Sequence, residues 1–246
     1  MSGSDNGDNG DDGAADGAVV EYRQHRFQPP SGATELLIVR HGESMPARAD
    51  QPFPLAGGHG DPPLAPEGEK EAERVGERLA LEQVDAIYVT TLQRTHQTAE
   101  PLARRTGVPV RVEADLREVY LGEWEGGLFR VKVAEGHPAA LRMMDEQRWD
   151  AIPGAETSDQ LATRVAAGLG RIVAAHPDQR VAVFTHGGVI AEILRQAAGS
   201  RSFAFLGADN GSISHLVATD GRWIIRRFND TAHLERTFTL APEPLT

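Results

Sequence analysis

Short apolar runs recur along the chain and predict buried strands. Three of them consist mainly of apolar side chains, and each is followed at once by turn or polar residues. These runs are residues 36–39, 85–89 and 181–184. A continuous apolar run of this length is typical of a parallel strand that is covered on both faces of its sheet. Residues 212–218 and 223–228, joined by Asp220-Gly221, predict two further strands.

Segments with helical spacing separate these strands. One helix is expected to open at Pro66, which suits a first helical turn, and a second to follow Arg94 and end near Gly107. The clearest apolar stripe has helical spacing through Leu161, Val165, Leu169 and Ile172. Residues 127–149 predict an additional helical excursion. Strands joined by such helices predict an α/β fold, a three-layer sandwich with a mostly parallel central sheet and helices on both faces.

Composition and charge narrow the class of protein. The formal net charge of −11 at pH 7 disfavours nucleic acid as a partner, because phosphate backbones bind basic surfaces. Residues 1–32 are rich in Gly and Asp, and too few of them are apolar to offset the entropy of ordering. We therefore predict a disordered acidic tail over residues 1–32 and a single domain over residues 33–246. With no cysteine and no apolar segment that could span a bilayer, we expect a soluble, cytoplasmic protein without membrane contact.

Candidate chemistry lies at the ends of the predicted strands. Arg40-His41-Gly42 directly follows the first apolar run, and His186-Gly187-Gly188 follows the third. Ligands of parallel α/β sheets bind beyond the carboxyl ends of the strands, so both histidines are expected at the same edge. Arg94 lies near the start of a predicted helix, where backbone N–H groups favour an anion. Two arginines and two histidines together predict a site for a phosphate dianion.

Several segments resemble the motifs of the histidine phosphatase superfamily, which includes cofactor-dependent phosphoglycerate mutases and many phosphatases. Five of them occur in the family's order, and residues 229–234 are similar to the family's usual ending. The five are residues 37–44, 64–72, 90–99, 116–126 and 186–188. Ala65 departs from the pattern, since a capping Thr or Ser is usual there. An ordered set of motifs is far more specific than a lone Arg-His-Gly.

The resemblance implies a role for each candidate residue. His41 would attack phosphorus and form a phosphohistidine, and Glu118 would protonate the leaving alkoxide and later accept a proton from water. His186 would act both in catalysis and in holding the phosphate. The phosphate-binding residues implied are Arg40, Arg94, His186 and Gly187. Because arginines neutralise the charge, neither a metal nor another cofactor is expected.

The sequence leaves alternatives open at some positions. Glu113, Glu123 and Glu125 are close enough to Glu118 for any of them to point into the cleft instead. The remaining histidines, including His59, are expected at the surface or in the core. The charged run over residues 67–77 is expected to be a solvated helix face.

Departures from the mutase-like pattern favour hydrolysis of a small phosphorylated metabolite. Glu118 is followed by Val119-Tyr120 where mutases have an arginine, and Ala47 and Gly188 stand where mutases have polar groups. Phosphoglycerate mutase-type transfer is the alternative, and a non-catalytic protein that binds a phosphorylated ligand is a third reading.

The expected partner is the small phosphorylated substrate, and a homodimer is an assembly that the sequence leaves open. Residues 45–63 and 127–152 are expected to select the leaving group. The second of these segments offers four basic side chains to an anionic substrate, Arg130, Lys132, Arg142 and Arg148.

Overall fold

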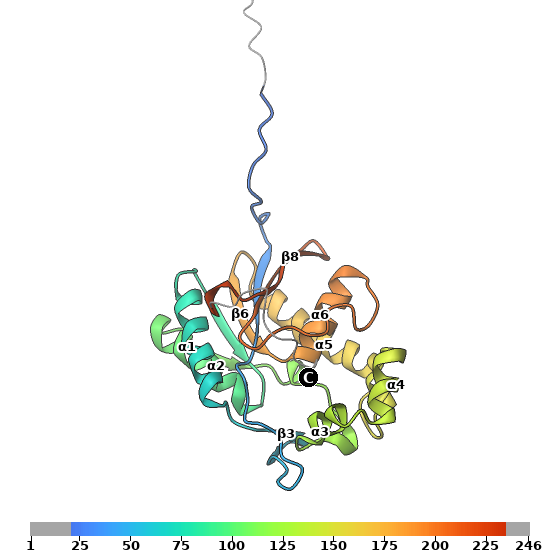
Figure 1. The fold of residues 1–246 in the computed structure, drawn as a ribbon. Helices are drawn as coiled ribbons and strands as arrows, with labels where there is room; N and C mark the ends of the chain where they lie inside the picture. The colour runs from blue at the N-terminus through green and yellow to red at the C-terminus, as the bar shows by residue number, and fades with distance from the viewer. Residues whose placement is uncertain (1–20, 235–246) are drawn as a thin grey trace, which may run out of the picture.

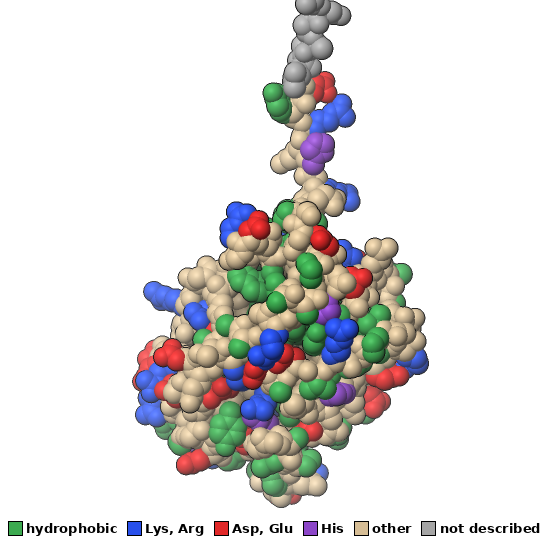
Figure 2. Space-filling view, turned by 180° about the vertical axis from the view of Figure 1, so that it is seen from behind, with side chains coloured by type: hydrophobic (Ala, Val, Ile, Leu, Met, Phe, Trp, Pro, Cys, Tyr) green, Lys and Arg blue, Asp and Glu red, His purple; other side chains and the backbone are tan. Residues whose placement is uncertain are grey.

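The computed structural model describes residues 21–234. Residues 1–20 and 235–246, which include most of the predicted tail, lie outside the described residues. Residues 21–30 form no helix or strand and run away from the rest of the molecule (Figure 1). In Figure 2 the same segment stands clear of a surface on which acidic and basic side chains are interspersed. The disordered tail and the boundary at residue 33 stay predictions.

Six strands form one mixed sheet in the order β5-β4-β6-β1-β7-β8. Their bounds are β1 (Thr34–Arg40), β4 (Ala86–Val89), β5 (Val110–Val112), β6 (Arg180–Thr185), β7 (Ile213–Thr219) and β8 (Arg222–Asp230). Strands β5, β4, β6 and β1 pair in parallel, whereas β7 and β8 are antiparallel. A separate hairpin joins β2 (Leu55–Ala56) to β3 (His59–Gly60). The mostly parallel sheet predicted from the apolar runs is confirmed.

Helices cover both faces of this sheet (Figure 1). They are α1 (Pro66–Ala80) and α2 (Gln93–Thr106) on one face, and α5 (Ser158–Ala175) and α6 (Gly187–Ala198) on the other. Successive side chains of a strand point to opposite faces. Leu37 and Val39 of β1 accordingly belong to the core cluster that includes α1 and α2. Leu36 and Ile38 belong to the cluster that includes α5 and α6, which confirms the three-layer sandwich.

Local sequence signals account for the ends of these elements. Helix α2 ends where Gly107 takes a left-handed conformation, with φ of 73°. Helix α5 begins with a capping box between Thr157 and Gln160. The hairpin between β7 and β8 turns at Asp220 and Gly221, whose φ angles are 47° and 70°, as a tight hairpin turn requires.

The helical excursion predicted over residues 127–149 is present as two helices, and a 3₁₀ turn lies on each side of this pair. They are η2 (Gly122–Trp124), α3 (Leu128–Ala134), α4 (Pro138–Glu146) and η3 (Trp149–Ala151). A further 3₁₀ turn, η1 (Ala114–Leu116), precedes them, and η4 (Ala232–Leu234) ends the described chain. Helices α3 and α4 and the β2–β3 hairpin lie at the end of the molecule opposite to residues 21–30 (Figure 1). Within residues 21–234, no helix is long and apolar enough to cross a membrane.

Candidate active site

Three neighbouring strands, β4, β6 and β1, bring the predicted site residues to one edge of the sheet. Arg40 ends β1, His186 follows β6 as the N-cap of α6, and Arg94 lies in the first turn of α2, which follows β4. The backbone N–H of His41 donates to the carbonyl of Thr185 over 3.0 Å, which ties the two strand ends together. The imidazole rings of His41 and His186 are 5.2 Å apart between centroids.

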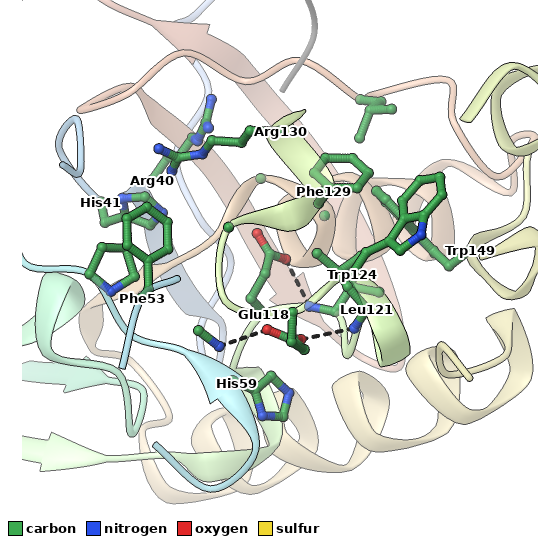
Figure 3. A pocket seen from close by; sticks show the side chains of 18 of the residues that line it. Arg40, His41, Phe53, His59, Glu118, Leu121, Trp124, Phe129, Arg130 and Trp149 are labelled. Atoms are coloured by element: carbon green, nitrogen blue, oxygen red, sulfur yellow. Dashed lines mark hydrogen bonds between the residues drawn. The ribbon is translucent and has the colours of Figure 1, made fainter. Parts of the chain in front are cut away.

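A pocket opens at this edge and is lined by side chains from distant segments (Figure 3). Five of the six predicted site residues line it, namely Arg40, His41, Arg94, Glu118 and Gly187. The sixth, His186, is fully buried against His41. The structure therefore brings together every residue that the motifs singled out.

His41 is held as a neutral imidazole with one nitrogen available. Its Nδ1 lies 2.7 Å from the carbonyl oxygen of Gly42, which accepts a hydrogen bond from this nitrogen and leaves the Nε2 lone pair free. Burial, followed by the charges of Arg94 and Arg40, lowers the pKa of His41 well below its ordinary value. At neutral pH the ring is therefore uncharged, which is the form that a nucleophile needs.

His186 is oriented by a threonine of the neighbouring strand end. Its Nε2 lies 2.9 Å from Oγ1 of Thr90, and this oxygen also accepts the N–H of Leu92 and lies 3.2 Å from Oγ1 of Thr95. Its buried Nδ1 has no hydrogen-bond partner among the described residues. Burial and the charges of Arg94 and His41 lower the pKa of His186 well below its ordinary value. The ring is therefore neutral, and it carries its proton on Nδ1 when the hydroxyl of Thr90 donates to Nε2.

The two predicted arginines are fixed by backbone carbonyls. Arg94 is buried, donates to the carbonyl of Gly60 over 3.0 Å, and lies 3.7 Å from Oδ1 of Asp61. Burial lowers its pKa to about 10, so it remains a cation at neutral pH. Arg40 donates to the carbonyl of Ala208. A Cβ at Gly187 would stand 3.4 Å from Nε of Arg40, so this glycine leaves room for the guanidinium.

Glu118 is partly exposed in the pocket. One carboxylate oxygen accepts the N–H of Val119 over 2.9 Å, and the other makes no hydrogen bond within residues 21–234. A Cβ at Gly188 would lie 2.9 Å from Oε1 of Glu118, so the carboxyl group sits against the start of α6. It is therefore close to the segment that carries His186.

The three competing glutamates are engaged elsewhere or point away. Glu113 forms an ion pair of 2.7 Å with Arg171. Glu123 is exposed to solvent. Glu125 also lines the pocket, but its two oxygens accept backbone N–H groups of Gly60 and Leu121 (Figure 3). Of these four carboxylates, Glu118 is the one that lines the pocket with an oxygen that makes no hydrogen bond within residues 21–234.

Residues 127–152 offer four basic side chains that were expected to meet an anionic substrate, and Arg130 is the one of the four that lines the pocket. It donates to Oγ of Ser44 over 2.7 Å and to the carbonyl of Met45 over 3.1 Å. It lies near enough to Arg40 for the two charges to repel, which together with burial lowers the pKa of Arg130. The other three basic residues bond outside the pocket, Lys132 to Glu135, Arg148 to Glu146 and Asp150, and Arg142 to the carbonyl of Ala151.

Two further side chains hold the loop that follows His41. Thr98 accepts the N–H of Gly42 over 3.0 Å and donates to the carbonyl of Arg94 over 2.7 Å, so it joins the segments that carry His41 and Arg94. Glu71 is buried and accepts the N–H of Glu43 over 2.8 Å. The expectation of a solvated face over residues 67–77 is wrong at this position. The available signal was that Glu71 lies on the same stripe of α1 as the buried residues beside it.

The arrangement suits one phosphoryl group. Two guanidinium groups supply positive charge, one neutral imidazole offers a lone pair, and the second offers an N–H donor. The N-termini of α2 and α6 meet at the same edge and also favour an anion. Within residues 21–234, no group of three or more His, Asp and Glu side chains is arranged to hold a metal ion.

Comparisons with known proteins agree with the motifs. The model of the histidine phosphatase superfamily (branch 1) matches residues 36–231. Phosphoglycerate mutase-like protein 4 of Arabidopsis thaliana is 34% identical over 210 residues, which cover 82% of this chain and 88% of that protein. The metal-independent phosphoserine phosphatase of the same plant is 34% identical over 209 residues, covering 83% and 84%. A solved mycobacterial glucosyl-3-phosphoglycerate phosphatase is 28% identical, with 81% and 100% covered and a TM-score of 0.69. The chain belongs to the histidine phosphatase superfamily.

Proposed function

We propose that this chain is a metal-independent phosphomonoesterase that hydrolyses a small phosphorylated metabolite through a phosphohistidine on His41. The observation that carries the proposal is a buried, neutral imidazole with a free Nε2, set between two arginine cations at the rim of the sheet. Relatives that are named as phosphatases of small phosphate esters support the same reaction class.

In the first step Nε2 of His41 attacks phosphorus in line with the ester oxygen. The N–P bond forms as the P–O bond to the alcohol breaks, and Glu118 in its protonated form gives its proton to the leaving oxygen. Arg40, Arg94 and the Nδ1–H of His186 hold the three non-bridging oxygens. Charge builds on these oxygens in the transition state, so loss of one such donor is expected to raise the barrier by about 3 to 4 kcal/mol.

In the second step water attacks the phosphohistidine. Glu118, now a carboxylate, takes a proton from that water, and the N–P bond breaks to release inorganic phosphate and regenerate neutral His41. The hydrogen bond from Nδ1 to the carbonyl of Gly42 keeps the ring in one orientation through both steps. The cycle requires no redox chemistry and no net proton transfer to the protein.

Hydrolysis is preferred to phosphoryl transfer because of the residues beside Glu118. A mutase has to retain an anionic sugar acid while it is rephosphorylated, which calls for cations next to the proton donor. Here the two residues that follow Glu118 supply no cation, because Val119 is apolar and buried and Tyr120 is an exposed tyrosine. The pocket cations that act on Glu118 are Arg94 and Arg130, which we assign to the phosphate end. Interconversion of 2- and 3-phosphoglycerate, followed by ³¹P NMR, tests the transfer alternative directly.

Release of inorganic phosphate from p-nitrophenyl phosphate tests the proposal. We expect His41→Ala to reduce turnover to the background rate, whereas His25→Ala, in the exposed segment 21–30, leaves it unchanged. Rapid acid-free quenching with ³²P-labelled ester should trap label on the wild-type protein and none on His41→Ala. Turnover that survives His41→Ala would exclude the phosphohistidine, and tight phosphate binding without turnover would indicate a non-catalytic protein.

The role of Glu118 is tested by changing the leaving group. Glu118→Gln should slow hydrolysis of an alkyl phosphate far more than that of p-nitrophenyl phosphate, because a nitrophenolate leaves without a proton. Glu123→Gln, at an exposed position, is the matched control. Equal slowing of both esters by Glu118→Gln would remove this residue from the acid role.

A further inference from the structure

The pocket continues beyond Glu118 into an apolar chamber. Six side chains form the chamber, Trp124, Phe129, Met143, Met144, Trp149 and Leu206. They come from η2, α3, α4, η3 and the segment before β7, so most of the chamber is built by residues 122–151, which cover the carboxyl end of the sheet. Phe129 and Leu206 are partly exposed and Met144 is 39% exposed, although all three are apolar. The pocket therefore keeps apolar surface open to a ligand.

Aromatic rings make up much of this chamber. The ring centroids of Trp124 and Phe129 are 6.4 Å apart, and those of Phe129 and Trp149 are 6.3 Å apart. The chamber begins next to the proposed acid, because a Cβ at Gly188 would lie 2.9 Å from Oε1 of Glu118 and 3.3 Å from Cζ2 of Trp149. A group that accepts a proton from Glu118 would therefore carry its substituent toward these rings.

The charges of the pocket lie at the opposite end. Figure 3 shows Arg40 and Arg130 together with His41 on one side of Glu118, and Trp124, Phe129 and Trp149 on the other. The third pocket arginine, Arg94, acts electrostatically on both His41 and His186, so it also belongs to the phosphate end. Arg130 is held by Ser44 and Met45 and repels Arg40, so it adds to the cationic phosphate end. Within the described residues, the Lys and Arg side chains that line the whole pocket are Arg40, Arg94 and Arg130, all at the phosphate end. A carboxylate in the chamber would therefore lose its hydration without gaining a counter-ion there.

We propose that the alcohol part of the substrate is apolar, an alkyl or aryl group that occupies this chamber, and not a sugar acid or an amino acid. The inference rests on the proposed phosphomonoesterase function and narrows its substrate class. Contact between the alcohol and the chamber removes apolar surface from water on both sides. Specificity then comes from the volume and the ring faces of the chamber, while the phosphate end supplies binding that all esters share.

Primary alkyl phosphates test this directly, because ethyl, butyl and hexyl phosphate differ in apolar surface and hardly in leaving-group basicity. Each methylene that enters the chamber should raise kcat/KM about fourfold, so that butyl phosphate exceeds ethyl phosphate by about sixteenfold. Phosphoserine and 3-phosphoglycerate should be poorer substrates than butyl phosphate. A flat alkyl series, or a preference for either of these two charged esters, would overturn the proposal.

Two variants of α4 provide a matched pair. Met144 lines the chamber and Leu141, 63% exposed on the same helix, does not. Met144→Lys should lower kcat/KM for hexyl phosphate at least tenfold and change inhibition by inorganic phosphate little, because a lysine there places a charge against the alkyl chain. Leu141→Lys should leave both quantities unchanged. Equal effects of the two substitutions would contradict the assignment of the chamber.

The experiment separates the two proposals. If the wild-type protein releases no phosphate from any ester, including p-nitrophenyl phosphate, the proposed function fails and the substrate class fails with it. If p-nitrophenyl phosphate is hydrolysed with dependence on His41 but chain length has no effect, the function stands and the apolar substrate class is refuted.

Discussion

Replacing Thr90 by valine removes the hydroxyl that orients His186, and this hydroxyl also accepts the N–H of Leu92 and lies 3.2 Å from Oγ1 of Thr95. Thr90 is fully buried, and valine has nearly the same shape without the hydroxyl. The substitution removes the 2.9 Å contact to Nε2 of His186 and leaves this nitrogen unpaired in a buried position. Thr95 keeps its bonds to the carbonyl of Leu92 and to the N–H of residue 90, so the turn before α2 persists.

The expected magnitude follows from the unpaired nitrogen. Loss of one partner of a buried hydrogen bond costs about 1 to 3 kcal/mol. Without Thr90 the ring of His186 can also carry its proton on Nε2, which would turn a lone pair toward the phosphate. We therefore expect kcat to fall by about tenfold to a hundredfold, together with a loss of about 1 kcal/mol or more in the free energy of unfolding.

Two measurements check this prediction, steady-state hydrolysis of p-nitrophenyl phosphate and unfolding in urea. Thr163→Val is the control, because Thr163 is exposed on α5 and its hydroxyl donates within the helix to the carbonyl of Asp159. A lower unfolding free energy with an unchanged kcat would show that the hydroxyl serves the fold alone. If neither kcat nor the free energy of unfolding changes, the Thr90–His186 hydrogen bond contributes no measurable free energy and the reasoning is refuted.

Two other predictions follow from the burial of the histidines and from the packing around Glu118. Folding lowers the pKa values of His41 and His186, so below about pH 6.5 the unfolded chain binds more protons than the folded chain. The free energy of unfolding should therefore be unaffected by these rings above that pH. On acidification below it, the free energy of unfolding should fall by at most about 1.4 kcal/mol per pH unit for each ring. Urea unfolding between pH 7.5 and 5.5 measures this slope, and an unchanged slope in a protein with both histidines replaced by glutamine would contradict it. Gly188→Ala would put a Cβ 2.5 Å from Cγ2 of Val119 and 2.9 Å from Oε1 of Glu118, so hydrolysis of ethyl phosphate should fall more than that of p-nitrophenyl phosphate. Gly170→Ala, which meets nothing within 4 Å, is its control, and equal losses for both esters would argue against displacement of the acid.

Much of the fold could be predicted because its signals are local. The buried strands β1, β4 and β6 read as apolar runs, and the stripe through Leu161 and Ile172 predicts α5 from spacing alone. Strand β5 could not be predicted in this way. Its three residues are all exposed and form no apolar run, and it exists as a strand because it pairs with β4 at the edge of the sheet.

The same distinction between local signals and contacts made only in the folded chain applies to the site residues. Arg40, His41 and His186 could be predicted because each is the last residue of a strand or directly follows one, and parallel strands end at a common edge. The roles of Thr90 and Glu71 could not be predicted, and Arg130 could not be distinguished from the three other basic residues of its segment, because each role is a contact between distant positions. Thr90 is 96 residues from His186, Glu71 is 28 residues from Glu43, and Arg130 is 86 residues from Ser44.

The sequence by itself determined the order of the main strands and helices, the family motifs and the residue types at the proposed phosphate site. Each of these depends on neighbouring residues or on a general rule of sheet topology. Tertiary structure alone decided which glutamate faces the pocket, how His186 is oriented, and that an apolar chamber adjoins Glu118. The orientation of His186 arises from its contact with Thr90, 96 residues away. The chamber forms when residues 122–152 and Leu206 pack over the carboxyl end of the sheet, and such packing depends on side-chain shape across the whole fold.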